Sequence, residues 1–383
     1  MSNIGPSILS KLDRKLYMQD QHPLCIVKNK IYEYFKERGF SSFDHFNPLV
    51  TVAQNFDALN VPWNHPSRKP SDTYYLNNQH LLRTHMTANE PEFIKMGHRA
   101  FVICGDVYRR DEIDSTHYPV FHQLEGVHIF DSDQLHLATR ELNHTCPFAD
   151  YGFSYNYETQ HEFDEGALKM ITSDLHIKLS GLMRHLFGPH IRMRWNQCYF
   201  PFTTPSYEIE IFYRDRWVEV CGSGVLMQSI LQECGAPATG WAFGLGLERI
   251  AMVLYDIPDI RWFWSEDPRF IRQFSKTIPD LKFVPFSKYP PINRDLSFWL
   301  AKGEHEFEMN SLCDLVRAHS GDLVEEVELI DVYQDKSPNL NRVSHCYRIT
   351  YRAIDRTLTD SEVNAMQERI QKDLESIHGV ILR

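Results

Sequence analysis

Four prolines crowd into a short stretch in the last third of the chain: Pro279, Pro285, Pro290 and Pro291. Because proline fixes φ and removes a backbone donor, a helix or a central strand does not run through such a stretch. We therefore predict a first domain over residues 1–277, a linker over 278–287 and a second domain over 288–383. The length of 383 residues fits a division of this kind, since domains average roughly 150 residues.

The second domain has a regular alternation of predicted elements. Residues 294–300 alternate apolar and polar side chains, which predicts a strand, and residues 306–318 have an apolar stripe at helical spacing. Two more strands are predicted at 323–333 and 343–353. Thr359 and Glu362 form a capping box that opens a helix, which Gly379 ends before a last short strand. The order βαββαβ is that of the ferredoxin-like split βαβ unit.

One face of the predicted strand 343–353 is polar and cationic, with Arg348, Thr350 and Arg352, and Arg342 and Arg356 flank it. Such a face can contact RNA backbone and bases, although a solvated outer face explains the same pattern. The chain has 40 Lys and Arg against 51 Asp and Glu, a net charge of −11. Binding of nucleic acid through bulk positive charge is therefore excluded, and an RNA site must be local.

The first domain mixes helices with strands joined by short connections. Strands are predicted at 100–110 and 119–130, and a hairpin pairs 207–213 with 217–222; a helix is predicted over 23–38. Strands joined by such short loops must pair antiparallel, so a Rossmann-type parallel sheet is not expected. The fold class predicted is α+β.

The strand 119–130 places an amide and a carboxylate, Gln123 and Glu125, on a face that is otherwise apolar. A buried carboxylate needs a partner, and a ligand's ammonium group would serve. Arg109 and His117 lie on the opposing strand and in the joining loop, which suits a substrate with both phosphate and amine. An internal ion pair between Arg109 and Glu125 is the alternative.

Three further segments carry candidate chemistry. Gly240–Arg249 is a glycine-rich turn into an apolar helix, but Arg249 stands where a dinucleotide fingerprint has its third glycine. Phe200 and Phe202 give two walls for an apolar or aromatic ligand, or ordinary core packing. Glu208, Glu210 and Glu219 can hold Mg²⁺ with a nucleotide, or form a solvated face; no metal ligand set is assigned.

Cysteine spacing and the length of apolar runs limit the kinds of site and partner that this chain can have. The eight cysteines are scattered without a C-x-x-C pair, which argues against a zinc ribbon or a disulfide framework. No apolar run approaches the roughly 18 residues of a membrane helix, so no membrane partner is expected.

Taken together, these segments resemble the class II aminoacyl-tRNA synthetases, and among them the phenylalanyl-tRNA synthetases of the monomeric mitochondrial type. Gly105–Arg110 with His117–Glu125 resembles motif 2, and Gly244–Arg249 with Asp256–Arg261 resembles motif 3. Phe200-Pro-Phe-Thr203 is similar to the phenylalanine-pocket segment. Lys288–Pro291 and Arg294-Asp295 resemble the start of the ferredoxin-fold anticodon-binding domain, and the likeness covers roughly residues 20–383.

The resemblance implies an antiparallel-sheet catalytic domain, ATP, L-phenylalanine and tRNA(Phe) as partners, and Mg²⁺ with the ATP. It implies catalytic roles for Arg109, His117 and Arg249. Its ATP-binding residues are Arg109, Thr116, His117, Tyr118, Phe121, Glu219 and Arg249. Its phenylalanine-binding residues are His85, Thr87, Ala88, Asn89, Glu90, Gln123, Leu124, Glu125, Phe200, Phe202 and Phe243. The tRNA-binding residues expected are Arg342, Arg348, Arg352 and Arg356.

One stretch departs from the family pattern. Relatives read Thr-Ser-Ala-His followed by Gln or Glu, whereas this chain reads Met86-Thr-Ala-Asn-Glu90. The resemblance further implies phenylalanyl-adenylate formation, acyl transfer to the 2′-hydroxyl of tRNA, no editing domain, a monomer, and the mitochondrial matrix, with the cytoplasm as the alternative. A catalytically inactive RNA-binding paralogue, a synthetase for another aromatic amino acid and a ligase without RNA remain open.

Overall fold

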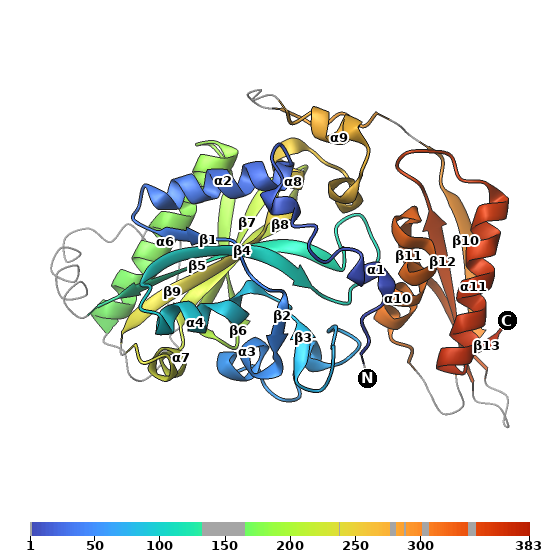
Figure 1. The fold of residues 1–383 in the computed structure, drawn as a ribbon, viewed down its shortest axis with the longest axis horizontal. Helices are drawn as coiled ribbons and strands as arrows, with labels where there is room; N and C mark the ends of the chain where they lie inside the picture. Colours follow the sequence, from blue (N-terminus) through green and yellow to red (C-terminus); the bar gives the residue numbers. More distant parts are fainter. Residues whose placement is uncertain are drawn as a thin grey trace.

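The structure is a computed structural model that describes residues 2–131, 165–236, 238–275, 281–286, 289–300, 306–335 and 342–383 (Figure 1). Parts of the predicted linker, residues 278–280 and 287, lie outside these ranges. None of the helices described has the length and apolar character that crossing a bilayer requires. The cysteines in the described ranges are free thiols.

A seven-stranded sheet forms the centre of the first domain, in the order β1-β4-β5-β9-β8-β7-β6. Neighbouring strands pair antiparallel except β1 and β4, which are parallel. The strands are β1 (Ser41–Phe43), β4 (Ala100–Tyr108), β5 (Val120–Phe130), β6 (Met193–Phe200), β7 (Thr203–Tyr213), β8 (Arg216–Leu226) and β9 (Thr239–Gly246). The predicted hairpins are confirmed, and β7 and β8 extend beyond the predicted ranges.

Three helices pack against one face of this sheet: α2 (Pro23–Lys36), α6 (Glu165–Phe187) and α8 (Leu247–Tyr255) (Figure 1). In α2, the predicted stripe of Leu24, Val27, Ile31 and Tyr34 is buried as expected for helical spacing. Of the helices in the described residues, the short α4 (Glu90–Lys95) and α7 (Gln228–Glu233) pack on the other face. We call this the open face, because part of it lines a cavity.

Small elements fill the remainder of the first domain. They are α1 (Pro6–Leu9), η1 (Leu16–Met18), β2 (Leu49–Thr51), α3 (Val52–Asn55), η2 (Asp57–Leu59), η3 (Pro66–Arg68), β3 (His80–Leu82), η4 (Met86–Asn89), η6 (Ile260–Trp264) and α9 (Pro268–Arg272). Strands β2 and β3 pair antiparallel beside the open face, and the 3₁₀ turn η4 leads directly into α4.

The second domain is the predicted βαββαβ unit, with sheet order β11-β12-β10-β13. Its elements are β10 (Ile292–Trp299), α10 (Met309–Ser320), η7 (Gly321–Leu323), β11 (Val324–Gln334), β12 (Val343–Tyr351), α11 (Asp360–His378) and β13 (Ile381–Leu382). The predicted capping box at Thr359 is confirmed. Helix α10 begins later than predicted, because Glu308 is extended and serves as its N-cap.

Residues 281–286 form neither helix nor strand, in agreement with their proline-rich sequence. They are nevertheless packed against the first domain, because the rings of Phe283 and Phe286 each lie 5.0 Å from that of Trp262. The Phe283 backbone N–H also donates to the Tyr255 carbonyl at 2.6 Å. The described half of the linker is thus part of the first domain's surface.

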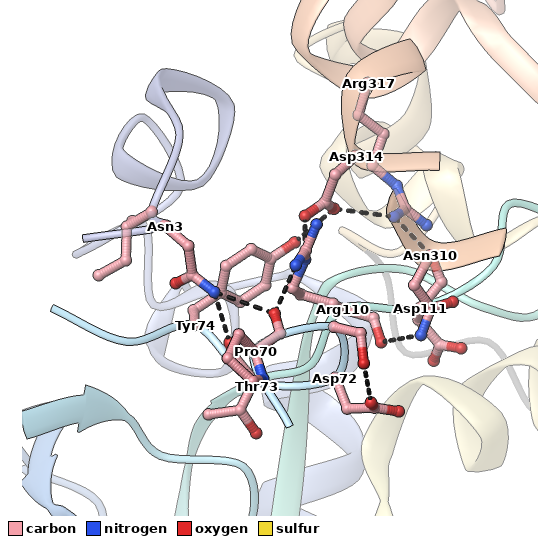
Figure 2. Close-up of polar contacts among 12 residues, drawn as sticks. Asn3, Pro70, Asp72, Thr73, Tyr74, Arg110, Asp111, Asn310, Asp314 and Arg317 are labelled. Carbon is pink, nitrogen blue, oxygen red and sulfur yellow. Dashed lines mark hydrogen bonds and ion pairs between the residues drawn. The ribbon is translucent and has the colours of Figure 1, made fainter. Parts of the chain in front are cut away.

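Helix α10 docks on the loop between β4 and β5 and ties the two domains together (Figure 2). Asp314 forms an ion pair with Arg110 and accepts a hydrogen bond from the Tyr74 hydroxyl at 2.9 Å. Arg317 donates to the carbonyl of Asp111 at 2.6 Å. This contact is polar and partly buried, so it depends on charged groups placed far apart in the sequence.

Candidate active site

A cavity of about 570 Å³ opens on the sheet face that the short helices leave uncovered. Strands β5, β8 and β9, the turn η4, the start of the β4–β5 loop and the β6–β7 connection all contribute to it. Predicted site residues that line the cavity are His85, Thr87, Glu90, Arg109, Gln123, Glu125, Phe200, Phe202, Glu219 and Phe243. Residues from five separate predicted segments therefore meet at one place.

The polar end of the cavity is built from η4, the first residue of α4, and β5. The Thr87 hydroxyl donates to Glu125 Oε2 at 2.7 Å, and the Met86 backbone N–H donates to Gln123 Oε1 at 3.2 Å. Gly244 on β9 pairs with Glu125 on β5. A Cβ on residue 244 would lie 3.3 Å from Glu125 Oε1. The glycine leaves room for the buried carboxylate.

The titration of the polar groups in the cavity is dominated by burial. Burial raises the pKa of Glu125 to about 7, against the opposing hydrogen bonds from Thr87 and the attraction of Arg109. Burial and the neighbouring Glu125 raise the pKa of Glu90 well above its usual range. Burial, then repulsion by Arg109, lowers the pKa of His85 to about 3, so its imidazole is neutral.

The apolar end is formed by three phenylalanines. The rings of Phe200 and Phe202 lie 5.8 Å apart and nearly parallel, at 9°. Phe243 on β9 is buried and stacks on Phe35 of α2, which fixes its ring. Gly222 on β8 allows Phe200 to approach, because a Cβ there would lie 2.9 Å from the Phe200 ring. The alternative that these aromatics only fill the core is therefore wrong, since Phe200 and Phe202 line an open cavity.

Arg109 stands where the cavity meets the β4–β5 loop. Its Nε donates to the Thr84 carbonyl at 2.8 Å, and its guanidinium carbon lies 5.1 Å from the centroid of the Phe121 ring. Among the described contacts no ion pair joins Arg109 to Glu125, so that sequence-based alternative is wrong. On the rim, Arg249 pairs with Glu219 at 3.5 Å, and Glu219 reaches into the cavity.

The structure places several predicted residues outside the cavity lining. His117 is held at 2.7 Å by Asp114, whose hydrogen bond raises the pKa of the imidazole, and Thr116 also donates to Asp114. The other predicted site residues outside the cavity lining are Ala88, Asn89, Tyr118, Phe121, Leu124 and Arg249.

Two of these placements correct the prediction. Leu124 points to the opposite face of β5 and is buried in the core under α2, α6 and α8, because side chains alternate along a strand. Tyr118 stacks on Trp264 and donates to Asp322 at 2.5 Å, so its side chain belongs to the contact between the domains.

The arginines predicted to bind tRNA are mostly paired with carboxylates. Arg348 makes two hydrogen bonds to Asp295, at 2.8 and 2.9 Å, and Arg352 pairs with Glu325 at 3.1 Å. Arg356 pairs with Glu362 at 2.9 Å. The cationic face that the sequence indicated is thus neutralised locally by neighbouring acids.

Two buried networks that support the site were not found from the sequence. Arg83 is fully buried and donates to Asp106 at 2.6 Å and to the Asn89 side chain at 3.3 Å, which orients η4. His122 and Glu248 join β5 to α8 at 2.6 Å. In the sequence, these networks are indicated only by charged or polar residues within apolar segments. That pattern does not show which residue each of them contacts.

Two carboxylates, Glu208 and Glu219, lie near the rim of the cavity. Burial, then Glu219, raises the pKa of Glu208, which places two carboxylates in mutual repulsion. In the described residues no group of three or more His, Cys, Asp or Glu side chains is arranged to hold a metal ion. Two carboxylates do fit Mg²⁺ bound jointly with substrate phosphates, which needs only one or two protein ligands.

Comparison with known proteins agrees with this geometry. The family model for the class II core domain (F) of tRNA synthetases matches residues 9–144 and 164–274, and that for the ferredoxin-fold anticodon binding domain matches 287–383. The mitochondrial phenylalanine–tRNA ligase of Mus musculus is 45% identical over 390 residues, covering 99% of this chain and 85% of that protein.

Two further relatives cover the whole of this chain. The chloroplastic/mitochondrial phenylalanine–tRNA ligase of Arabidopsis thaliana is 46% identical and is itself 83% covered. The mitochondrial enzyme of Saccharomyces cerevisiae is 38% identical and 92% covered. The predicted resemblance and fold class are confirmed. With a class II core, an anticodon-binding domain and relatives matched from end to end, the chain belongs to the phenylalanine–tRNA ligase family.

Proposed function

We propose that this chain attaches phenylalanine to tRNA(Phe) with ATP, through a phenylalanyl-adenylate and acyl transfer to the 2′-hydroxyl of the terminal adenosine. One observation carries the substrate assignment: a single cavity joins a buried carboxylate to stacked aromatic walls. Its aromatic end is formed by the uncharged side chains of Phe200, Phe202 and Phe243, and the His85 imidazole beside Phe202 is neutral. An uncharged aromatic amino acid matches both ends.

In this proposal the substrate's ammonium group binds between Glu125, Gln123 and Thr87. Glu125 supplies the charge, while Thr87 and the Met86 backbone already orient Glu125 and Gln123. The phenyl ring lies against Phe200 and Phe202, with Phe243 at the back of the cavity. Edge and face contacts of this kind contribute about 0.5–1.5 kcal/mol beyond area burial for each pair of rings.

ATP would lie over the rim, with its α-phosphate near Arg109. Phe121 and Arg249 would bracket the adenine, an arrangement that benefits from stacking and cation–π attraction. His117 would reach the terminal phosphates after leaving Asp114. Mg²⁺ bound with the phosphates, beside Glu219 and Glu208, would neutralise charge on the triphosphate.

The chemistry needs no side-chain nucleophile. The substrate carboxylate attacks the α-phosphorus, pyrophosphate leaves, and the tRNA hydroxyl then displaces AMP from the acyl group. The chain contributes positioning and charge stabilisation, chiefly through Arg109. Arg109 is already fixed by the Thr84 carbonyl, so little reorganisation is required.

We further propose that the second domain binds the anticodon region of tRNA, that the protein acts as a monomer, and that it works in the mitochondrial matrix. The family model for the domain and the mitochondrial relatives support these assignments. Because Arg348, Arg352 and Arg356 are paired with acids, RNA phosphates would have to compete for them.

The deciding experiment is amino-acid-dependent exchange of pyrophosphate into ATP, run with a panel of amino acids. Phenylalanine should support exchange at least tenfold better than tyrosine, and charging of tRNA(Phe) should follow. Exchange with a different aromatic amino acid would reassign the substrate. Absence of exchange with any amino acid would reject the enzyme, and calorimetry with ATP would then test for an inactive paralogue.

Arg109→Ala should lower phenylalanine-dependent exchange by about 10²–10³-fold, because it removes a preorganised donor at the reacting phosphate. Arg99→Ala is the control: Arg99 is exposed at the far end of the same hairpin. An Arg109→Ala enzyme with activity near that of Arg99→Ala would contradict the assigned role.

We also propose that no second site edits mischarged tRNA, so rejection of tyrosine depends on the cavity alone. A hydrophobic pocket excludes one added hydroxyl only by about 10². Preformed tyrosyl-tRNA(Phe) should therefore be hydrolysed no faster with the enzyme than without it. Enzyme-dependent release of tyrosine would show that an editing site exists.

A further inference from the structure

The cavity contains a second buried carboxyl group, Glu90, which the resemblance places among the phenylalanine-binding residues but to which the contacts proposed above give no role. Glu90, the first residue of α4, is only 2% exposed, and its Oε1 is buried without a hydrogen-bond partner. Glu90 itself keeps the family pattern, which has Gln or Glu at this position, although Met86 and Asn89 before it depart from that pattern. A buried polar atom without a partner is costly, so its position at the wall of a binding cavity indicates a ligand.

Glu90 and Glu125 line the same cavity, and Thr87, three residues before Glu90, donates to Glu125. Two buried carboxylates at one place repel each other when both are ionised, and a proton on one of them relieves that repulsion. Both groups are buried, Glu125 being 4% exposed, which further disfavours two negative charges side by side. The ligand-free pair therefore holds one proton.

Among the described groups around the pair, Arg109 attracts Glu125. Its guanidinium is held by the Thr84 carbonyl and is also attracted by Asp111 and Glu219, so its charge is shared among several carboxylates. His85 on the chain before η4 is kept neutral by burial. Cys221 on β8 and Cys234 directly after α7 are neutral thiols, since burial raises the pKa of both.

We infer that the Glu90–Glu125 pair exchanges its shared proton for the ammonium group of the amino acid, so that substrate binding releases a proton. This inference rests on the proposed function and deepens it. The charges balance: a pair with one proton carries −1, the ammonium carries +1, and the complex has two carboxylates around one ammonium plus a proton in solvent. The ammonium's three donors then satisfy Glu90 Oε1 together with Glu125.

Such exchange makes the site selective for charge as well as shape. A ligand with the aromatic ring but no ammonium leaves the proton in place and gains nothing from Glu90. The exchange also makes affinity depend on pH. Below the apparent pKa of the pair the proton competes with the ammonium, and the Kd rises by up to about tenfold per pH unit.

The test is calorimetry of L-phenylalanine binding to the full chain without ATP, from pH 6 to 8, in buffers of different ionisation enthalpy. The dependence of the apparent enthalpy on the buffer gives the number of protons released. We expect the number of protons released to be largest, at one or more, at the acidic end and to fall as pH rises. Titration with 3-phenylpropionate, which lacks the ammonium, should release none.

Glu90→Gln is the informative variant, because the amide keeps the shape and donates to Glu125 without adding charge. It should abolish most of the proton release and flatten the rise of Kd with falling pH over this range. Glu92→Gln is the matched control, since Glu92 is exposed on the same helix, and it should behave like the unaltered chain.

Binding of phenylalanine without proton release, or equal release by the chain and its Glu90→Gln variant, would overturn the inference while leaving the proposed function intact. Failure of the unaltered chain to bind or activate phenylalanine would instead reject the proposed function. Should Glu90→Gln not fold, the pH series and 3-phenylpropionate titration of the unaltered chain still decide the question.

Discussion

Glu125 shows what a single residue's sequence context can and cannot reveal. The alternation of β5 predicted that Gln123 and Glu125 share a face, and their position in the cavity confirms it. The contacts of Gln123 with Met86 and of Glu125 with Thr87 were not predictable from local pattern, because 37 and 38 residues separate the partners and only the folded sheet brings them together. The same limit hid Gly244, which looked like part of a glycine-rich turn.

Gly244→Ala should raise the KM for phenylalanine about five- to tenfold. The new Cβ would lie 3.2 Å from Glu125 Cγ, and Glu125 cannot yield because Thr87 holds it. Gly246→Ala, on the same strand, meets no atom within 4 Å and should leave that KM unchanged. Steady-state exchange kinetics measure both variants, and equal KM values would refute the steric explanation.

Whole elements were more predictable than individual contacts, because caps and periodicity are local. In α11 the sequence predicted both ends, and Thr359 and Gly379 occupy them as expected. Strand β5 shows where the sequence-based prediction failed. The faces of Gln123 and Glu125 were predicted correctly, but Leu124 was assigned to the site although side-chain alternation places it in the core. A motif carried over as a continuous segment ignores that neighbouring side chains face opposite ways.

Thr359→Ala should destabilise the second domain by about 1 kcal/mol, because its hydroxyl accepts from the Glu362 backbone N–H and its loss leaves that donor without its cap. Ser361→Ala changes an exposed residue in the first turn of the same helix and serves as the control. Urea unfolding followed by circular dichroism compares the two, and equal midpoints would show that the capping box contributes nothing.

At the scale of the whole molecule, composition and proline distribution predicted two units but not how they are joined. The ion pair of Arg110 with Asp314 links residues 204 apart, and each looks like an ordinary surface charge in the sequence. Asn310 of α10 even contributes to the wall of the active-site cavity. Relative domain placement depends on such long-range polar contacts, which have no periodic signature.

Asp314→Ala should lower the free energy of unfolding by about 1–3 kcal/mol, since Tyr74 and Arg110 lose their common acceptor. Asp331→Ala, an exposed carboxylate on β11, is the control for charge removal in the same domain. Equilibrium denaturation monitored by tryptophan fluorescence gives both values, and a difference below about 0.5 kcal/mol, the usual size of a surface effect, would contradict the structure.

The aromatic packing of Phe283 and Phe286 on Trp262 also sets a geometric limit on the molecule. Only residues 287–291 lie between this anchor and the first residue of β10 at Ile292. Even fully extended, a tether of that length spans about 20 Å. However the second domain turns, the start of β10 stays within that radius of Phe286. Even if the polar contacts of α10 were broken, the start of β10 could not move farther from Phe286 while the aromatic anchor holds.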